Sequence, residues 1–197
     1  MLKRALVLFA SMIALASMAR AMLDDGPASG AHLPSQAAAD ILRDVASTDG
    51  AFLAAGLVRE SYQAENLASL LQYPTDELVV VSLTGSQIRQ AFERTLSLYP
   101  LPNTSFLQIS GFEVQFSKGA ESGRRVTNVT ASGAKLDDDK TYTVAMPSSL
   151  GRGGLGYFKI WDKSKITKTL DGVTIESALK GKRFTDSSPR WVEHLSF

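Results

Sequence analysis

The chain has 197 residues, a formal net charge of +1, two histidines and no cysteine. This length suits one domain, and the balanced charge gives no electrostatic footprint for binding nucleic acid. His32 and His194 are too few and too far apart in the sequence to build the multi-histidine centre of a zinc or di-metal hydrolase within one monomer. We therefore expect no metal site and no cysteine nucleophile in this chain, and both histidines at its surface.

Residues 1–21 have the pattern of a secretory signal peptide. Lys3 and Arg4 precede an apolar or small run from Ala5 to Met18, and Ala19-Arg20-Ala21 offers a small-x-small cleavage site. A membrane anchor is the alternative, but the run is shorter than the about 20 residues that a bilayer span needs. We expect a periplasmic or secreted protein that has no membrane attachment after cleavage.

The rest of the chain is predicted to hold a flexible leader at 22–34, one domain at 35–183 and an irregular tail at 184–197. In the first half of the domain, apolar residues at helical spacing predict helices, and a β-branched run predicts a central strand. The helices are expected at Ser35–Ala46, Glu65–Leu71 and Ser86–Leu96, and the strand at Leu78–Leu83.

The second half of the domain is predicted to be rich in strands, followed by a last helix at Val173–Leu179. Apolar and polar residues alternate in these segments, which is typical of strands with one buried face. The order of elements indicates the α+β class: a single layered domain with N-terminal helices and a mixed, mostly antiparallel sheet. The strands are expected at Phe106–Ile109, Phe112–Phe116, Val126–Ala131 and Tyr142–Met146.

A glycine-rich loop follows the last of these strands. Four glycines fall within the six residues from Gly151 to Gly156, and the aromatic pair Tyr157–Phe158 comes directly after them. Because glycine has no side chain, the backbone of such a loop can approach a ligand closely. The pattern alone leaves two interpretations of Tyr157 open, a core aromatic and a ring that contacts a ligand.

Five blocks of the sequence occur in an order and spacing that resemble a known family. Together they resemble the C-terminal domain of the 5′-nucleotidase family, which includes bacterial UDP-sugar hydrolases, over roughly residues 36–182. The blocks are AENLASLL (64–71), ELVVVSLTGSQIRQAFE (77–93), SFLQISGFEVQF (105–116), TYTVAM (141–146) and GRGGLGYF (151–158).

The resemblance implies a substrate-binding role. In the family, a separate N-terminal metallophosphoesterase domain holds two metal ions and performs hydrolysis. The C-terminal domain holds the nucleobase between two aromatic rings, each gaining about 1–3 kcal/mol of stacking energy. The first ring position matches Tyr73, in the segment Leu71-Gln72-Tyr73. The second matches Tyr157, in Gly153-Gly154-Leu155-Gly156-Tyr157, where Gly154 counts among the substrate-binding positions.

Two charged residues match further positions of that family. Arg59 ends the segment Gly56-Leu57-Val58-Arg59 and is the counterpart of an arginine that holds the ribose or phosphate. Asp162 is the candidate for a carboxylate that contacts the ribose. From the residues alone, a surface ion pair for Arg59 and a solvated turn for Asp162 are the alternatives.

Three positions depart from the family pattern. Ala54–Ala55 stands where the family has an asparagine that binds the base, and Leu155 replaces the aspartate of the glycine loop. Gln72–Tyr73 replaces a proline–phenylalanine pair. These changes allow stacking but affect base specificity and loop geometry.

Three functions are therefore compatible with the sequence. The first is an exported nucleotide- or nucleoside-binding module that does not hydrolyse its ligand alone and needs no cofactor. The second is the specificity subunit of a split 5′-nucleotidase, in which a separate metallophosphatase partner supplies the divalent metals. The third is a remnant of the fold kept for protein contacts, with the ligand pocket lost.

Overall fold

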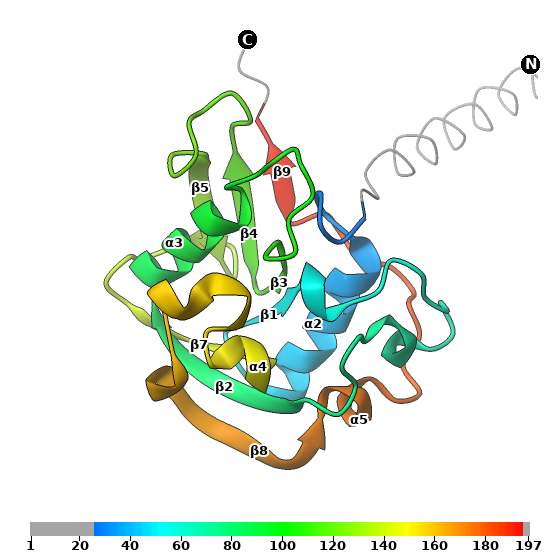
Figure 1. Ribbon diagram of the computed structural model, residues 1–197. Coiled ribbons are helices and arrows are strands. Elements are labelled where there is room, and N and C mark those ends of the chain that lie inside the picture. The colour runs from blue at the N-terminus through cyan, green and yellow to red at the C-terminus, as the bar shows by residue number, and fades with distance from the viewer. Residues whose placement is uncertain (1–25, 195–197) are drawn as a thin grey trace, which may run out of the picture.

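The computed structural model describes residues 26–194 (Figure 1). The predicted signal peptide at 1–21 and the first residues of the predicted leader lie outside this range. No helix in the described range is long and apolar enough to cross a membrane.

Residues 26–194 form two sheets, and the larger has five strands in the order β3-β1-β7-β2-β8. Strands β1 and β7 are parallel, and every other neighbouring pair is antiparallel. Strand β2 lies inside the sheet, and its run of valines and leucines is buried on both faces. The strands are β1 (Gly50–Ala54), β2 (Glu77–Thr84), β3 (Leu107–Ser110), β7 (Thr141–Pro147) and β8 (Ile166–Thr174).

The second sheet has four strands in the order β6-β5-β4-β9 and lies at the end of the molecule away from β8 (Figure 1). The strands are β4 (Phe112–Phe116), β5 (Val126–Ala131), β6 (Ala134–Lys135) and β9 (Trp191–Glu193). Strand β9 pairs in parallel with β4, and the indole N–H of Trp191 donates a hydrogen bond to the Leu107 carbonyl at 2.8 Å. The predicted irregular tail at 184–197 thus contains one strand, β9, next to the core, while 184–190 have no helix or strand and 195–197 lie outside the described residues.

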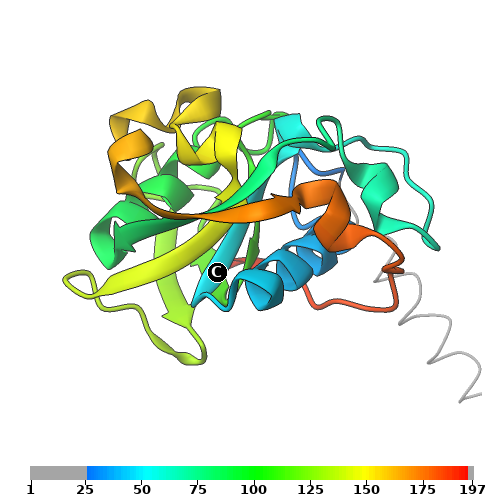
Figure 2. The same cartoon turned by 90° about the horizontal axis from the view of Figure 1, so that it is seen from below.

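Helices cover both faces of the larger sheet. The regular helices are α2 (Leu33–Ala46), α3 (Gly85–Thr95), α4 (Ser148–Gly151) and α5 (Ile175–Leu179). Short 3-10 turns lie at η1 (Ala55–Leu57), η2 (Leu67–Leu70), η3 (Gly154–Lys159) and η4 (Lys163–Lys165). Figure 2 shows α2 on one face of the sheet and the yellow-to-gold segment with α4 and η3 on the other. Helix α3 starts with a capping box in which Thr84 and Gln87 bond reciprocally to each other's backbone.

The predicted fold class, α+β with a mixed and mostly antiparallel sheet, is confirmed. The predicted helix at Glu65–Leu71 is only the 3-10 turn η2. The helix predicted from Val173 begins at Ile175, because Val173 and Thr174 belong to strand β8.

The residues before α2 pack against the domain, which differs from the predicted flexible leader. The side chain of Gln108 donates hydrogen bonds to the carbonyls of Pro27 and Gly30, both at 2.8 Å. His32 is buried, its ring lies 2.7 Å from the Ser35 hydroxyl, and its backbone N–H donates to Gln108. The expectation of a surface histidine was wrong here, because Gln108 supplies the partners that this segment needs inside the protein.

Candidate functional site

The predicted segments with Arg59 and Tyr73 run side by side. Val58 and Leu71 form an antiparallel bridge, and the Arg59 N–H donates to the Leu70 carbonyl at 2.7 Å. The Arg59 side chain, which follows the bridge on one segment, is exposed, and the Tyr73 side chain, which follows it on the other, is 56% exposed. The fold thus brings the two segments together, with Arg59 at one end of the bridge opposite Leu70 and Tyr73 beyond the other end, both open to solvent.

The glycine loop approaches the same segments. A Cβ atom on Gly56 would lie 3.1 Å from the Leu155 side chain, so Leu155 packs directly on the Gly56 backbone. Leu155 has a φ of 53° and Gly156 a φ of 81°, in the left-handed region that favours glycine. The position that carries an aspartate in the family therefore carries an apolar side chain turned against the Arg59 segment.

Gly154 is required by the turn itself. A Cβ atom at this position would lie 2.6 Å from the Ser149 carbonyl oxygen, so any larger residue would push α4 and the loop apart. This contact explains the glycine at position 154 without a ligand.

The loop is held from behind by two side chains. The Leu155 carbonyl accepts hydrogen bonds from Arg94 Nη2 at 2.7 Å and from the Ser105 hydroxyl at 2.8 Å. Arg94 also lies over the Tyr157 ring, with its Cζ atom 5.2 Å from the ring centroid. These contacts fix the loop against α3.

Tyr157 is fully buried in the structure. Its ring stacks on Trp161 with a centroid separation of 4.6 Å, and its hydroxyl donates to the Ser105 carbonyl at 2.6 Å. Burial raises the pKa of Tyr157 above its ordinary value of 10.0, although the contacts with Thr95 and Arg94 partly oppose this shift. The Tyr157 ring is therefore part of the core. The next residue, Phe158, is 64% exposed.

Asp162 acts as the N-cap of η4. Its carboxylate accepts a hydrogen bond from the Ser164 N–H at 2.8 Å. Hydrogen bonds from Ser164 lower the pKa of Asp162 from its ordinary value of 3.8. The carboxylate is exposed and charged near neutral pH, so it can also accept a hydrogen bond from a ligand hydroxyl.

A cavity of about 690 Å³ lies beside the Tyr73 segment. The strand β2 side of this cavity carries the carboxylates of Asp76 and Glu77, and the α4 side carries Arg152. Its volume lies within the range of small-molecule sites. The full lining consists of Thr75, Asp76, Glu77, Ser148, Ser149, Arg152 and Thr174.

Sequence reasoning did not find this cavity. Asp76 accepts a hydrogen bond from the Ser149 N–H at 3.1 Å, which joins the Tyr73 segment to α4 across 73 residues of sequence. The only sequence signal was the position of Ser148–Arg152 between a strand and the glycine loop. Within residues 26–194, no group of three or more histidine, aspartate or glutamate side chains is arranged to hold a metal ion.

Comparison with known proteins shows the family to which this chain belongs. The family model for the 5′-nucleotidase C-terminal domain matches residues 26–162, more than half of the chain. The chain belongs to the 5′-nucleotidase C-terminal domain family. A trifunctional nucleotide phosphoesterase, YfkN of Bacillus subtilis, is 31% identical over 118 residues, covering 57% of this chain and 8% of the relative. Mouse 5′-nucleotidase is 32% identical over 107 residues, covering 50% of this chain and 18% of the relative.

Solved structures show the same fold. The 5′-nucleotidase precursor from Thermus thermophilus has a TM-score of 0.67 at 21% identity, covering 94% of this chain and 43% of that chain. NAD nucleotidase from Haemophilus influenzae has a TM-score of 0.63 at 17% identity, covering 81% of this chain and 33% of that chain. The chain thus spans less than half of these solved 5′-nucleotidase-type proteins and a smaller part of the curated relatives.

Proposed function

We propose that this 5′-nucleotidase C-terminal domain binds a nucleoside or nucleotide at Tyr73 and the cavity beside the Tyr73 segment, with Arg59 reaching the ligand from the adjacent segment. The observation that carries the proposal is the Val58–Leu71 bridge, which places an exposed aromatic ring and an exposed guanidinium on adjacent segments. Membership of the family supports the ligand class, since the curated relatives named above are nucleotide phosphoesterases or 5′-nucleotidases.

Each group has a chemical role in this proposal. The Tyr73 ring stacks on one face of the base, and Arg59 pairs with a phosphate through charge-assisted hydrogen bonds. The carboxylate of Asp76, which lines the cavity, accepts hydrogen bonds from ribose hydroxyls, whereas Asp162 is not among the lining residues. A clamp with Tyr157 as the second ring would require that ring to leave Trp161 and break its bond to Ser105. We therefore propose stacking on Tyr73 alone, with Tyr157 as support for the loop.

Calorimetry on the chain without residues 1–21, with adenosine, AMP and UDP-glucose as ligands, tests this proposal. Tyr73→Ala is expected to weaken binding about tenfold, from the loss of about 1–3 kcal/mol of stacking, whereas Tyr73→Phe keeps the stacking face and is the matched control. Tyr73 is exposed, so neither change should lower the thermal midpoint appreciably. Absence of heat and of NMR shift changes at millimolar ligand would refute nucleoside binding.

A second candidate function is the specificity subunit of a split 5′-nucleotidase. It is supported by the family match, because the family model that matches residues 26–162 is that of a C-terminal domain. We propose that hydrolysis, and the divalent metals it requires, come from a separate metallophosphatase. Mixing the chain with such a protein should raise its AMP hydrolysis rate, and an unchanged rate would count against this candidate.

Export is also part of the proposal. The pattern at residues 1–21 supports a periplasmic or secreted protein. Fractionation of the producing cells, with the N-terminus of the exported chain sequenced, should find the chain outside the cytoplasm and starting at Met22. A full-length chain retained in the cytoplasm would contradict export.

A further inference from the structure

A second cavity lies behind the glycine loop, on the side of α3. It has a volume of about 350 Å³ and is bounded by α3, by the tip of the β4–β5 hairpin and by η3. Figure 1 shows α3 between that hairpin and the gold η3 segment. Its lining includes the charged or hydroxyl-bearing residues Glu93, Arg94, Ser97, Ser122 and Lys159. None of them was among the predicted site residues, and the proposed nucleoside site does not use them.

Arg94 has donor capacity that the protein does not use. Its Nη2 atom donates to both Leu155 and Ser105, and its Nε atom is buried without a hydrogen-bond partner. Among residues 26–194, no carboxylate lies within ion-pair distance of Arg94. The Nε atom is itself buried and does not reach the cavity, but a partly buried guanidinium without a counter-ion favours an anion nearby.

The other charges of this cavity add to the same preference. Lys159 is exposed and also has no carboxylate partner in the described part of the chain. Glu93 is the one carboxylate in the lining, and its two oxygens accept the backbone N–H groups of Arg125 and Val126 at 3.0 and 2.8 Å. Two cations therefore face the cavity against one carboxylate that is already hydrogen-bonded.

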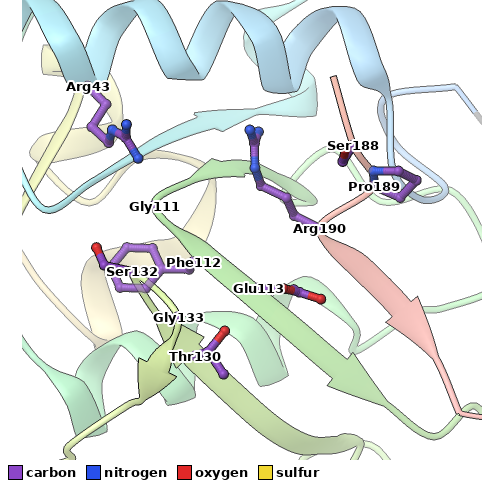
Figure 3. Close-up of a pocket in the computed structure, with 10 residues that line it drawn as sticks. All are labelled: Arg43, Gly111, Phe112, Glu113, Thr130, Ser132, Gly133, Ser188, Pro189 and Arg190. Carbon is purple, nitrogen blue, oxygen red and sulfur yellow. The ribbon is translucent and has the colours of Figure 1, made fainter. Parts of the chain in front are cut away.

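A different arginine-lined cavity shows the contrast (Figure 3). There the guanidinium of Arg190 points toward α2 and pairs with Asp40 at 2.7 Å, and it also donates to the Ile109 carbonyl at 2.9 Å. Arg43, in the same lining, contacts Asp44 at 3.4 Å, and the exposed Glu113 also faces this space. The charges of that cavity are matched within the protein, whereas those around Arg94 are not.

We propose that the cavity lined by Arg94 and Lys159 binds a phosphate-class oxyanion, either free or as a phosphomonoester. Lys159 and the Arg94 guanidinium neutralise the charge of the ion. The hydroxyls of Ser97 and Ser122 donate hydrogen bonds to its oxygens. The cavity exceeds the size of one phosphate group, so an organic group can be attached. The bound ion shares Arg94 with the glycine loop.

The test is an NMR titration of the isotope-labelled chain with inorganic phosphate at constant ionic strength. Saturable shifts are expected at the amides of Ser122, Gly123 and Gly156. Lys159→Gln should weaken phosphate binding by about five- to tenfold, the effect of losing one charge-assisted hydrogen bond. Lys168→Gln, which removes the same charge from an exposed position of β8, is the matched control and should leave the affinity unchanged.

Further titrations separate the possible sources of the ion and the two proposals. Saturation by glycerol 3-phosphate more tightly than by inorganic phosphate would assign the site to phosphomonoesters, and the reverse order to the free ion. Adenosine carries no phosphate and should not shift these amides, so this site and the nucleoside site can fail independently. Non-saturable shifts, equal affinity in Lys159→Gln, or shifts confined to the cavity with Arg43 would each overturn the proposal.

Discussion

The rings of Tyr157 and Trp161 stack nearly parallel, with an angle of 13° between their planes. Tyr157 lies in η3, and Trp161 follows η3 about one turn later. The indole N–H of Trp161 donates to the Leu150 carbonyl at 2.9 Å, so the stacked pair also holds α4 in place. The glycine loop is therefore built on a buried aromatic stack. A ligand meets the backbone and the exposed side chains of this loop before it can meet the Tyr157 ring.

The first prediction concerns the pH dependence of stability. The pKa of Tyr157 is raised by burial above 10.0, so the folded state keeps its proton where the unfolded state loses it. This contribution is fully present below pH 10 and is lost as the pH rises above it. Relative to Tyr157→Phe, the free energy of unfolding should fall by about 1.4 kcal/mol at one pH unit above 10. Urea unfolding of both proteins from pH 8 to 11 measures this difference.

Tyr157→Phe also removes a hydroxyl that has two partners, Ser105 and Thr95. At pH 8 this variant should be about 1–3 kcal/mol less stable, since the Ser105 carbonyl loses a buried donor. Comparing the two proteins isolates the contribution of the one hydroxyl in which they differ. If the free energies of unfolding of the unchanged protein and Tyr157→Phe changed in parallel above pH 10, this would contradict a buried, protonated Tyr157 hydroxyl.

The sequence predicted the central elements well, because their signals are local. The valine-rich run at Leu78–Leu83 lies within β2, and the block order identified the family. It could not decide whether Tyr157 was exposed, because that depends on Trp161 and on contacts from Ser105 and Thr95, distant in sequence. The same limit applies to Trp191, whose strand forms only by pairing with β4.

The second prediction concerns Gly156, which lies against Arg94. Gly156→Ala should destabilise the fold, because the new Cβ atom would overlap Arg94 Nη2 and break its bonds to the Leu155 carbonyl and the Ser105 hydroxyl. Gly172→Ala is the matched control, with a similar φ of 72° but no atom within 4 Å of the new Cβ. Thermal unfolding should show Gly156→Ala to be less stable than the control by about 1–3 kcal/mol. An equal loss of stability in the two variants would mean that Arg94 can move away from residue 156 without destabilising the fold.

The third prediction concerns the chain end. Arg190 is 20% exposed, pairs with Asp40 and donates to the carbonyls of Gln36 and Ile109. Arg190→Ala should lower the free energy of unfolding by about 2 kcal/mol, because it leaves Asp40 without its cation. Arg183→Ala removes an ion pair with Glu65 that is 68% exposed on the arginine side, and should change stability by less than about 0.5 kcal/mol. Denaturant unfolding compares the two, and similar losses would contradict a docked chain end.

Only part of the candidate site could be predicted from the sequence, because some of its residues are defined by contacts that are distant in sequence. Arg59 and Tyr73 were predicted because each matches a family motif, and the Val58–Leu71 bridge joins their two segments. Arg94 was not found because it looks like any charged residue on the polar side of a helix. Its role depends on a carbonyl 61 residues away, and no local pattern reports such a contact.

The last prediction separates charge recognition from base stacking at the proposed nucleoside site. Arg59→Gln should weaken AMP binding by about five- to tenfold and leave adenosine binding unchanged, because only AMP carries a phosphate for the guanidinium. Added salt should reduce the difference, since Arg59 is exposed to solvent. Calorimetry with both ligands at two salt concentrations measures this, with Lys168→Gln as the control for a general change in charge. Equal weakening of AMP and adenosine would show that Arg59 shapes the Tyr73 segment through its backbone bridge and does not contact the phosphate.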